Sequence, residues 1–127
     1  MKKRIVTFNQ FDVVIVPFPF TDSVGTKRRP ALVISDRLIF NASMGRSVMA
    51  MITTANHAPW ALDLNILDLS NTGLTSFSIV RIKLFTLDDV LVVKQIGALS
   101  QVDRDALQEK IAAFLVFNHQ SKLGGFL

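Results

Sequence analysis

The chain has 127 residues, and half of them are hydrophobic, with a mean hydropathy of +0.39. This is the usual length of one domain, and the apolar fraction is enough to build a core, which excludes global disorder. Fourteen Lys and Arg against ten Asp and Glu give a net charge of +4, a modest excess that favours anionic partners. We therefore expect a single domain over residues 1–127.

The chain contains no cysteine, which excludes disulfide frameworks, zinc ribbons, thiol catalysis and iron–sulfur ligation. The basic start, residues 1–11, lacks the apolar stretch and the cleavage site of a signal peptide. Every apolar run is shorter than the ~20 residues of a membrane helix. These features predict a soluble, cytoplasmic protein.

The first half of the chain predicts three strands. Residues 11–18 (FDVVIVPF) are mostly β-branched or aromatic and are ended by prolines, as in a strand. Residues 20–29 hold Thr, Asp, Ser and Gly and precede a proline, which predicts an exposed loop. Residues 31–35 (ALVIS) and 47–54 (SVMAMITT) predict buried strands joined through a turn at 41–45.

Apolar and polar residues alternate in the next part of the chain. Residues 62–66 (LDLNI) and 77–84 (FSIVRIKL) show the period of two that is typical of strands, with turn residues at 71–73 between them. Residues 90–99 predict a further strand. Because the strands follow one another through short connections, we expect a mostly β fold, a curled antiparallel sheet or small barrel.

The last element is predicted to be a helix that begins near Val102. Ser100 followed by Asp103 resembles a capping box and marks its start. One amphipathic C-terminal helix should cover a face of the sheet, and residues 121–127 should fray. The apolar positions at helical spacing are Leu107, Ile111, Phe114, Leu115 and Phe117.

Most familiar catalytic arrangements are missing from the sequence. The glycines are scattered, so no phosphate-cradling glycine loop is predicted. His57 and His119 do not stand at metal-ligand spacing to carboxylates, and we read both as loop or solvated residues. Asp88 and Asp89 would point to opposite faces of a strand, so they indicate a turn rather than an acid–base pair. No cofactor or metal is expected.

What remains is positive charge beside polar strand ends. Lys27, Arg28 and Arg29 form one run, Thr53 and Thr54 end a predicted strand, and Arg81 and Lys83 lie on another. Guanidinium groups suit phosphate because they offer several fixed donors and stay charged. A phosphate site is one interpretation, and a solvated basic turn is the other.

The same residues carry a family resemblance. Residues 12–22 (DVVIVPFPFTD) with 27–35 (KRRPALVIS) closely resemble the N-terminal signature of the MazF/PemK/Kid toxins. The resemblance covers roughly residues 10–115. Further matching segments are residues 51–54 (MITT), 73–81 and 95–100 (QIGALS).

The resemblance implies an SH3-like antiparallel barrel with a C-terminal helix, usually in a homodimer. It also implies the toxic half of a toxin–antitoxin pair, an mRNA interferase that cleaves single-stranded RNA at specific sequences without a metal ion or cofactor. The implied partners are single-stranded RNA and a cognate antitoxin protein. An antitoxin segment would lie across the basic groove and offer acidic residues to Arg29.

In the implied reaction the ribose 2′-hydroxyl attacks the adjacent phosphorus and the 5′-oxygen leaves. Arg29 matches the family's Arg before Pro and would stabilise charge on the phosphoryl oxygens. Thr53 matches the Thr at a strand end and would orient the scissile phosphate or the 2′-hydroxyl, while Arg81 matches an Arg that some members use. The implied RNA-binding residues are Lys27, Arg28, Thr21, Thr54 and Lys83, with Phe20 or Trp60 available for base stacking.

Two positions depart from the family pattern. Lys83 stands where some members of the Kid branch carry a catalytic Asp, and Phe11 stands where the family usually has Gly. These departures keep two alternatives open, a CcdB-like gyrase poison of the same fold and a degenerate module that only binds RNA or antitoxin. Each site residue also has a structural interpretation, for example an Arg29 paired with Asp22 or Asp36.

Overall fold

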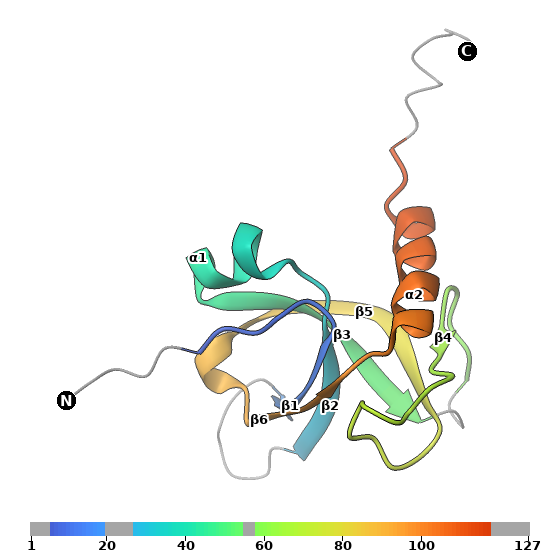
Figure 1. Cartoon of the computed structure of the whole chain (residues 1–127), viewed down its shortest axis with the longest axis horizontal. Coiled ribbons are helices and arrows are strands. Elements are labelled where there is room, and N and C mark those ends of the chain that lie inside the picture. The colour runs from blue at the N-terminus through green and yellow to red at the C-terminus, as the bar shows by residue number, and fades with distance from the viewer. Residues whose placement is uncertain (1–5, 20–26, 55–57, 118–127) are drawn as a thin grey trace, which may run out of the picture.

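The computed structural model describes residues 6–19, 27–54 and 58–117. In this part of the chain a six-stranded antiparallel sheet curls on itself in the order β4-β5-β3-β2-β1-β6, and helix α2 stands against it (Figure 1). The predicted fold class is confirmed. The strands are β1 (Asp12–Phe18), β2 (Lys27–Val33), β3 (Arg46–Thr54), β4 (Leu64–Asn65), β5 (Ser78–Asp88) and β6 (Lys94–Ala98), and the long helix is α2 (Gln101–Phe114).

The cationic run is part of a strand, and its prediction as a loop is wrong. Lys27, Arg28 and Arg29 open β2 and pair with the end of β1, with Val16 opposite Arg29. Backbone pairing extends this ribbon beyond the core, so the three side chains stay exposed although the backbone is fixed. Residues 20–26 of the predicted loop lie outside the described residues.

The turn predicted at 41–45 is longer and more regular. It consists of η1 (Arg37–Asn41) and α1 (Ala42–Met44), and Gly45 ends it in the left-handed conformation. Asp36 caps the first turn, because its carboxylate accepts a hydrogen bond from the Ile39 amide. Asn41 is fully buried and donates to the carbonyl oxygens of Phe8 and Ser35, which ties the turn to the N-terminal segment.

The later strands have other bounds than the alternation predicts. β4 keeps only two residues of 62–66, and Leu62 before it has a positive φ of 66°. β5 runs on to Asp88 because it pairs with β3 along its whole length. The predicted strand at 90–99 begins later, since η2 (Asp89–Leu91) forms a 3-10 turn first. Asp89 begins this turn, as predicted, whereas Asp88 is the last residue of β5 and pairs with Arg46.

Two glycines let the loop after β4 close onto β6. The Ala98 amide donates to the Asn71 carbonyl oxygen at 2.8 Å. A Cβ on Gly73, whose φ is +77°, would lie 2.4 Å from the Ile96 carbonyl oxygen, and one on Gly97 would lie 2.3 Å from that of Asn71. Only glycine permits this approach, which brings the two edges of the curled sheet together.

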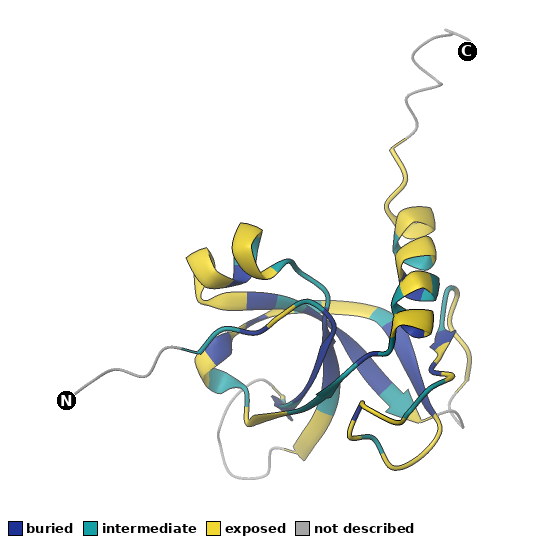
Figure 2. Ribbon diagram, viewed as in Figure 1, coloured by how far each residue is buried: buried dark blue, intermediate teal, exposed yellow. Residues whose placement is uncertain are grey.

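Both faces of the central strands are buried. Val13 of β1 and Leu32 of β2 pack with Leu107 of α2, whereas Val14 and Ala31 pack in a second cluster with Met49, Leu87 and Phe8. Side chains alternate along a strand, so neighbouring residues enter different clusters. This explains why the strands are continuous apolar runs, and Figure 2 shows the buried centre of the sheet.

Helix α2 begins where the sequence predicts, but Asp103 works differently from a capping box. Ser100 is the N-cap and its hydroxyl donates to Asp103 at 3.2 Å, without capping an amide. The fully buried Asp103 carboxylate accepts from the amides of Leu67 and Asp68, at 3.0 Å each. It therefore fastens the segment after β4 to the helix. The end of the helix is not covered, because Phe114, Leu115 and Phe117 are exposed.

Phe11 occupies the backbone position of the family's usual glycine. Its φ is +74°, the left-handed region that favours glycine. Its ring is buried, the Arg104 guanidinium carbon lies 5.2 Å from the ring centroid, and its amide donates to the Val33 carbonyl oxygen at 2.7 Å. Burial of the aromatic ring offsets the unfavourable backbone conformation.

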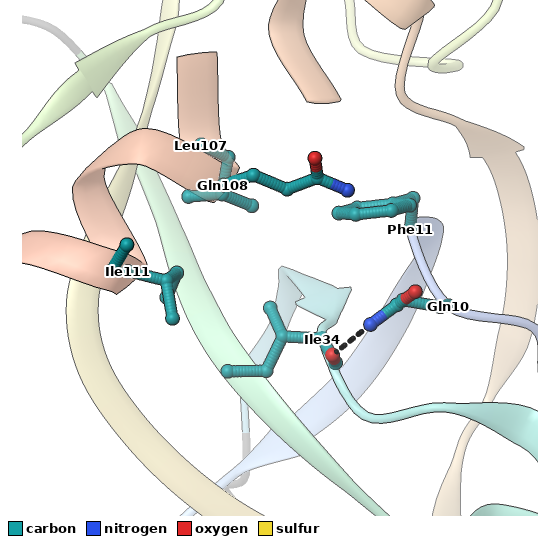
Figure 3. A pocket seen from close by; sticks show the side chains of 7 residues that line it. Gln10, Phe11, Ile34, Leu107, Gln108 and Ile111 are labelled. Carbon is teal, nitrogen blue, oxygen red and sulfur yellow. Dashed lines mark hydrogen bonds between the residues drawn. The ribbon is translucent and has the colours of Figure 1, made fainter. Parts of the chain in front are cut away.

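An apolar hollow of about 250 Å³ separates α2 from the sheet beside Phe11. Figure 3 shows Leu107 and Ile111 of the helix facing Ile34. The carbonyl oxygen of Ile34 accepts a hydrogen bond from the side-chain Nε2 of Gln10. No charged side chain lines this hollow, so it offers nothing to a phosphate. In the described residues no helix is long and apolar enough to span a membrane.

Candidate functional site

A second hollow, of about 250 Å³, lies at the end of β1, β2, β3 and β5, and we call it the cationic hollow. It brings together four of the predicted site residues from three strands. Three of these four are cations, which distinguishes it from the apolar hollow under α2. The residues that define it are Phe18, Arg29, Met51, Thr53, Arg81 and Lys83.

Strand register explains this gathering. Arg81 of β5 pairs with Met51 of β3, so their side chains lie on one face together with Thr53, two residues along β3. The register then shifts, and Ala50 is already opposite Leu84. The extra residues of β5 form a bulge, a feature that re-aims side chains. Lys83, two residues after Arg81 in β5, lines the same hollow.

Arg81 is bound to a carboxylate within the protein. Its Nε and Nη2 atoms lie 3.1 and 2.9 Å from the two carboxylate oxygens of Asp63, and Nη2 also donates to the Ala58 carbonyl oxygen at 2.8 Å. The guanidinium carbon lies 5.1 Å from the ring centroid of Trp60. Both charged side chains are about nine-tenths buried, at 10% and 11% exposure. Arg81 is therefore not an ordinary outward-facing strand residue.

This pair also decides the acid–base character of Asp63. The hydrogen bonds from Arg81 hold the pKa of the Asp63 carboxyl below its usual value of 3.8, because they favour the ionised form. The Trp60 amide also donates to Asp63, and a carboxylate of low pKa that already accepts three hydrogen bonds is a weak proton acceptor. Asp63 therefore orients Arg81 and does not replace the Asp that Lys83 displaces.

Arg29 and Lys83, by contrast, carry charges that no described carboxylate neutralises. Their cationic groups lie 5.5 and 5.9 Å from the ring centroid of Phe18, and neither forms an ion pair with a described residue. Asp36, one predicted partner of Arg29, caps η1 instead. Asp22, the other, lies outside the described residues. Two cations beside one aromatic ring give the hollow an uncompensated positive charge.

The cationic hollow can therefore hold an anion. Arg29 offers a planar fork of donors, Lys83 offers a compact charge, and the Thr53 hydroxyl makes no hydrogen bond with a described residue. These groups suit the equatorial oxygens of a phosphate and the extra negative charge of a phosphoryl transition state. In the described part of the chain, no three His, Asp or Glu side chains are grouped closely enough to hold a metal ion.

The remaining predicted site residues lie around this hollow or outside the description. Lys27 and Arg28 are exposed at the start of β2, and Arg28 points to the opposite face from Arg29 because strand side chains alternate. Neither lines the cationic hollow. Trp60 is half-exposed, with Arg81 against its ring. Thr21, Phe20 and His57 lie outside the described residues, as do His119 and the tail from residue 118.

A third hollow, of about 210 Å³, lies on the other side of Arg29 and Thr53, and we call it the hydroxyl hollow. The sequence analysis placed Thr54 near the site but missed Thr75, Ser76 and Ser78, since this segment was interpreted only as the connection to the strand predicted at 77–84 and the start of that strand. The only signal was the run of hydroxyl residues in TSFS. Its polar lining residues are Arg29, Thr53, Thr54, Thr75, Ser76 and Ser78.

A fourth hollow, of about 560 Å³, adjoins the N-terminal segment and the η2 turn. Asp89, which lines it, is buried and accepts a hydrogen bond from the Ser47 hydroxyl at 2.7 Å, and its Oδ2 has no hydrogen-bond partner among the described residues. Burial raises the pKa of Asp89. Lys94 is the single cation that lines this hollow, and neither Thr53 nor Thr54 lines it, so the cationic hollow is the stronger candidate for phosphate chemistry.

The fold of the chain is similar to those of several solved structures. Among solved structures, the chain is similar to the Mycobacterium tuberculosis toxin MazF-mt6, with 24% identity, a TM-score of 0.65, and 84% of this chain and 98% of that chain covered. It is also similar to the MazE–MazF structure from Deinococcus radiodurans, with 16% identity, a TM-score of 0.66, and 89% and 99% covered. An endoribonuclease in complex with its cognate antitoxin, from a mycobacterial species, gives 15% identity, a TM-score of 0.66, and 88% and 96% covered.

These identities support the fold, whereas a family model identifies the family. A search of curated proteins found no match. Residues 9–115 match the model of the PemK-like, MazF-like toxin of type II toxin–antitoxin systems. This range contains every strand of the described sheet and all of α2. The chain therefore belongs to the PemK-like and MazF-like toxins of type II toxin–antitoxin systems.

Proposed function

We propose that this toxin is a sequence-specific endoribonuclease that cleaves single-stranded RNA in the cytoplasm without a metal ion. One observation carries the proposal: Arg29 and Lys83, which form no ion pair with a described residue, bring two positive charges to one hollow that Thr53 also lines. Such a hollow fits one phosphodiester of an RNA backbone. The family supports the reaction class, because similar proteins are described as endoribonucleases.

The reaction is a transfer within the RNA. The 2′-oxygen forms a bond to phosphorus and releases its proton to solvent water, while the bond from phosphorus to the 5′-oxygen breaks and that oxygen takes up a proton from Arg29. The products are a 2′,3′-cyclic phosphate and a 5′-hydroxyl. Charge on the non-bridging oxygens is greatest midway, and this is where the Arg29 guanidinium contributes most. In this proposal Arg29 is also the proton donor to the departing oxygen, and it regains that proton from solvent.

The other residues have positioning and binding roles in this proposal. Thr53 orients the scissile phosphate or the 2′-hydroxyl through a hydrogen bond. Arg81, oriented by Asp63, contributes its remaining donor capacity and charge from the wall of the hollow. Lys83 binds a phosphate oxygen. Lys27, Arg28, Thr54 and Thr21 contact the RNA outside the scissile phosphate, and Trp60 offers a half-exposed ring for stacking.

The positive charge of Arg29 and Lys83 also suggests how an antitoxin binds. Titles of similar structures describe complexes with MazE or with a cognate antitoxin. We propose that a cognate antitoxin places acidic side chains over Arg29 and Lys83 and so excludes RNA from the cationic hollow. We also propose a homodimer, because the end of α2 exposes Phe114, Leu115 and Phe117 (Figure 2).

The test is incubation of the purified protein with a long single-stranded RNA in EDTA, with mapping of every cut end. The expected result is a set of discrete cuts ending in cyclic phosphate, which Arg29→Ala abolishes while RNA remains bound. Arg28→Ala, the neighbouring cation on the opposite face of β2, is the matched control, and it should weaken binding and its salt dependence without abolishing cleavage. Intact RNA with a folded dimer, with or without gyrase inhibition, would contradict the proposal.

A further inference from the structure

We propose that the hydroxyl hollow binds the base of the nucleotide adjoining the scissile phosphate, and that Thr75 and Ser76 select that base. This inference rests on the proposed function and assigns the part of the substrate that the cationic hollow leaves unbound. The location supports it first, because Arg29 and Thr53 line both hollows. A phosphate held between them would place its neighbouring nucleotide beside the hydroxyls.

The chemistry of the lining suits a neutral ring rather than a second phosphate. Apart from Arg29 at its rim, the hollow has no charged side chain. Pro30, Ile52 and Leu74 supply apolar surface for the face of a base, and the hydroxyls of Thr75 and Ser76 can donate to or accept from its edge. Bases of single-stranded RNA are recognised in this manner, by contact with the ring face and hydrogen bonds to the edges.

The size of the hollow agrees with a single base. Its volume of about 210 Å³ lies below the ~300 to 1,000 Å³ of pockets that enclose a whole drug-sized ligand. One flat ring system fits, and the sugar and phosphate remain outside, next to Thr53. The two hollows thus divide one nucleotide between them, with the phosphate on the cationic side and the base on the hydroxyl side.

The hollow is also preorganised, which selection of a base requires. The Thr72 hydroxyl donates to the Leu69 carbonyl oxygen at 2.8 Å and accepts from the Leu74 amide at 3.1 Å. The Ser78 hydroxyl donates to the Ser76 carbonyl oxygen at 2.9 Å. Gly73 packs against the Ile96 backbone. Residues 72–78 are therefore fixed from both ends, whereas the exposed Thr75 and Ser76 hydroxyls make no hydrogen bond with a described residue.

The experiment compares the wild type with Thr75→Val/Ser76→Ala, which removes two hydroxyls and keeps most of the volume. Cut sites are mapped on a long RNA of mixed sequence, and the rates are sorted by the base at each position around the cut. We expect the double variant to weaken the preference at one position next to the cut by about three- to tenfold, as for one or two neutral hydrogen bonds. Preferences at other positions should persist.

Thr86→Val is the matched control, because Thr86 is an exposed hydroxyl residue of β5 that pairs with Val48 and lines neither hollow. It should leave every preference unchanged. An unchanged preference in the double variant, or an equal change at all positions, would overturn the inference and leave the proposed function standing. A wild type that does not cut RNA needs a second measurement, the binding of four labelled single-stranded RNAs that differ in one base.

If the wild type binds these four RNAs without cutting them, the same loss of preference is expected in their affinities. Affinities that do not depend on the base would then overturn the inference. A wild type that neither cuts nor binds RNA would overturn the proposed function and this inference together.

Discussion

Two arginines line the same hollow, and their surroundings give them different roles. Arg81 is nine-tenths buried and bound by both oxygens of Asp63, whereas Arg29 is exposed and has no carboxylate partner among the described residues. The guanidinium group is the same in both. A charge that is already satisfied inside the protein has little left for a ligand, so Arg81 maintains the site and Arg29 is available for the substrate.

The sharpest test of this difference is Arg29→Lys, which keeps the charge and removes the planar fork. We expect cleavage to fall by about a hundred- to a thousandfold, the usual effect of losing one preorganised donor at the transition state. RNA affinity should stay within about threefold, because the charge remains. Single-turnover cleavage and RNA titration measure the two quantities. Equal losses in both would mean that Arg29 serves binding alone.

Arg81→Met should act on stability first. It leaves the buried Asp63 carboxylate without its partner, which destabilises the folded state, and we expect the Tm to fall by about 5 to 10 °C. Thermal unfolding followed by circular dichroism measures this. Arg29→Met is the matched control and should leave the Tm within about 2 °C. A similar loss in both variants would remove the distinction between the two arginines.

The ion pair of Asp63 with Arg81 predicts that the stability of the fold depends on pH. Because Arg81 lowers the pKa of Asp63 in the folded state, the stabilisation is present above the unfolded pKa near 3.8 and is lost as the pH falls through the lower folded value. Asp63→Asn should therefore reduce the free energy of unfolding by about 1 to 3 kcal/mol at pH 7 and by much less near pH 2. Urea unfolding across this range is the measurement.

Asp89→Asn is the matched control for that experiment, because burial raises the pKa of Asp89. A raised pKa contributes stability below about pH 3.8 that is lost as the pH rises through the folded value. Removing this acid should flatten the decline of stability above pH 4, opposite to the effect at Asp63. Curves of the same shape for both variants would show that the Arg81 partner is not what separates the two acids.

The smallest effect is expected at Lys83. Lys83→Ala removes an exposed, flexible cation from the hollow, and we expect a three- to tenfold loss of RNA affinity, with the salt dependence reduced by about 0.7 in slope. The Tm should not change. Lys94→Ala, an exposed cation outside the hollow, is the control. A loss of cleavage as large as that of Arg29→Lys would instead place Lys83 in the chemistry.

Much of the fold could be predicted from local patterns. The apolar run at 47–54 and the period of two at 77–84 marked two strands, and Ser100 marked the start of α2, as the structure confirms. The misses have a common cause. Lys27, Arg28 and Arg29 look like a loop because they are polar, yet backbone pairing with β1 makes them a strand. Exposure is a property of side chains, and strand formation depends on the partner backbone.

The sequence predicted only the part of the site that lies in family motifs, and it missed residues whose partners are far away in the chain. Family resemblance singled out Arg29, Thr53, Arg81 and Lys83, and the structure brings these four to one hollow. Residues Thr75 and Ser76 were missed, because nothing local connects them to Arg29, which is 46 and 47 positions earlier in the chain. Asp63 was missed as well, since its partner Arg81 lies 18 residues away.

The sequence by itself determined the mostly β class, the C-terminal helix and the family of this protein, because these follow from short-range periodicity and a contiguous motif. Only the tertiary structure decided which arginine is neutralised, that the Phe11 backbone adopts a left-handed conformation with its ring in the core, and that two hollows flank Arg29 and Thr53. These properties depend on contacts between residues far apart in the chain, and strand register and the bulge in β5 set those contacts.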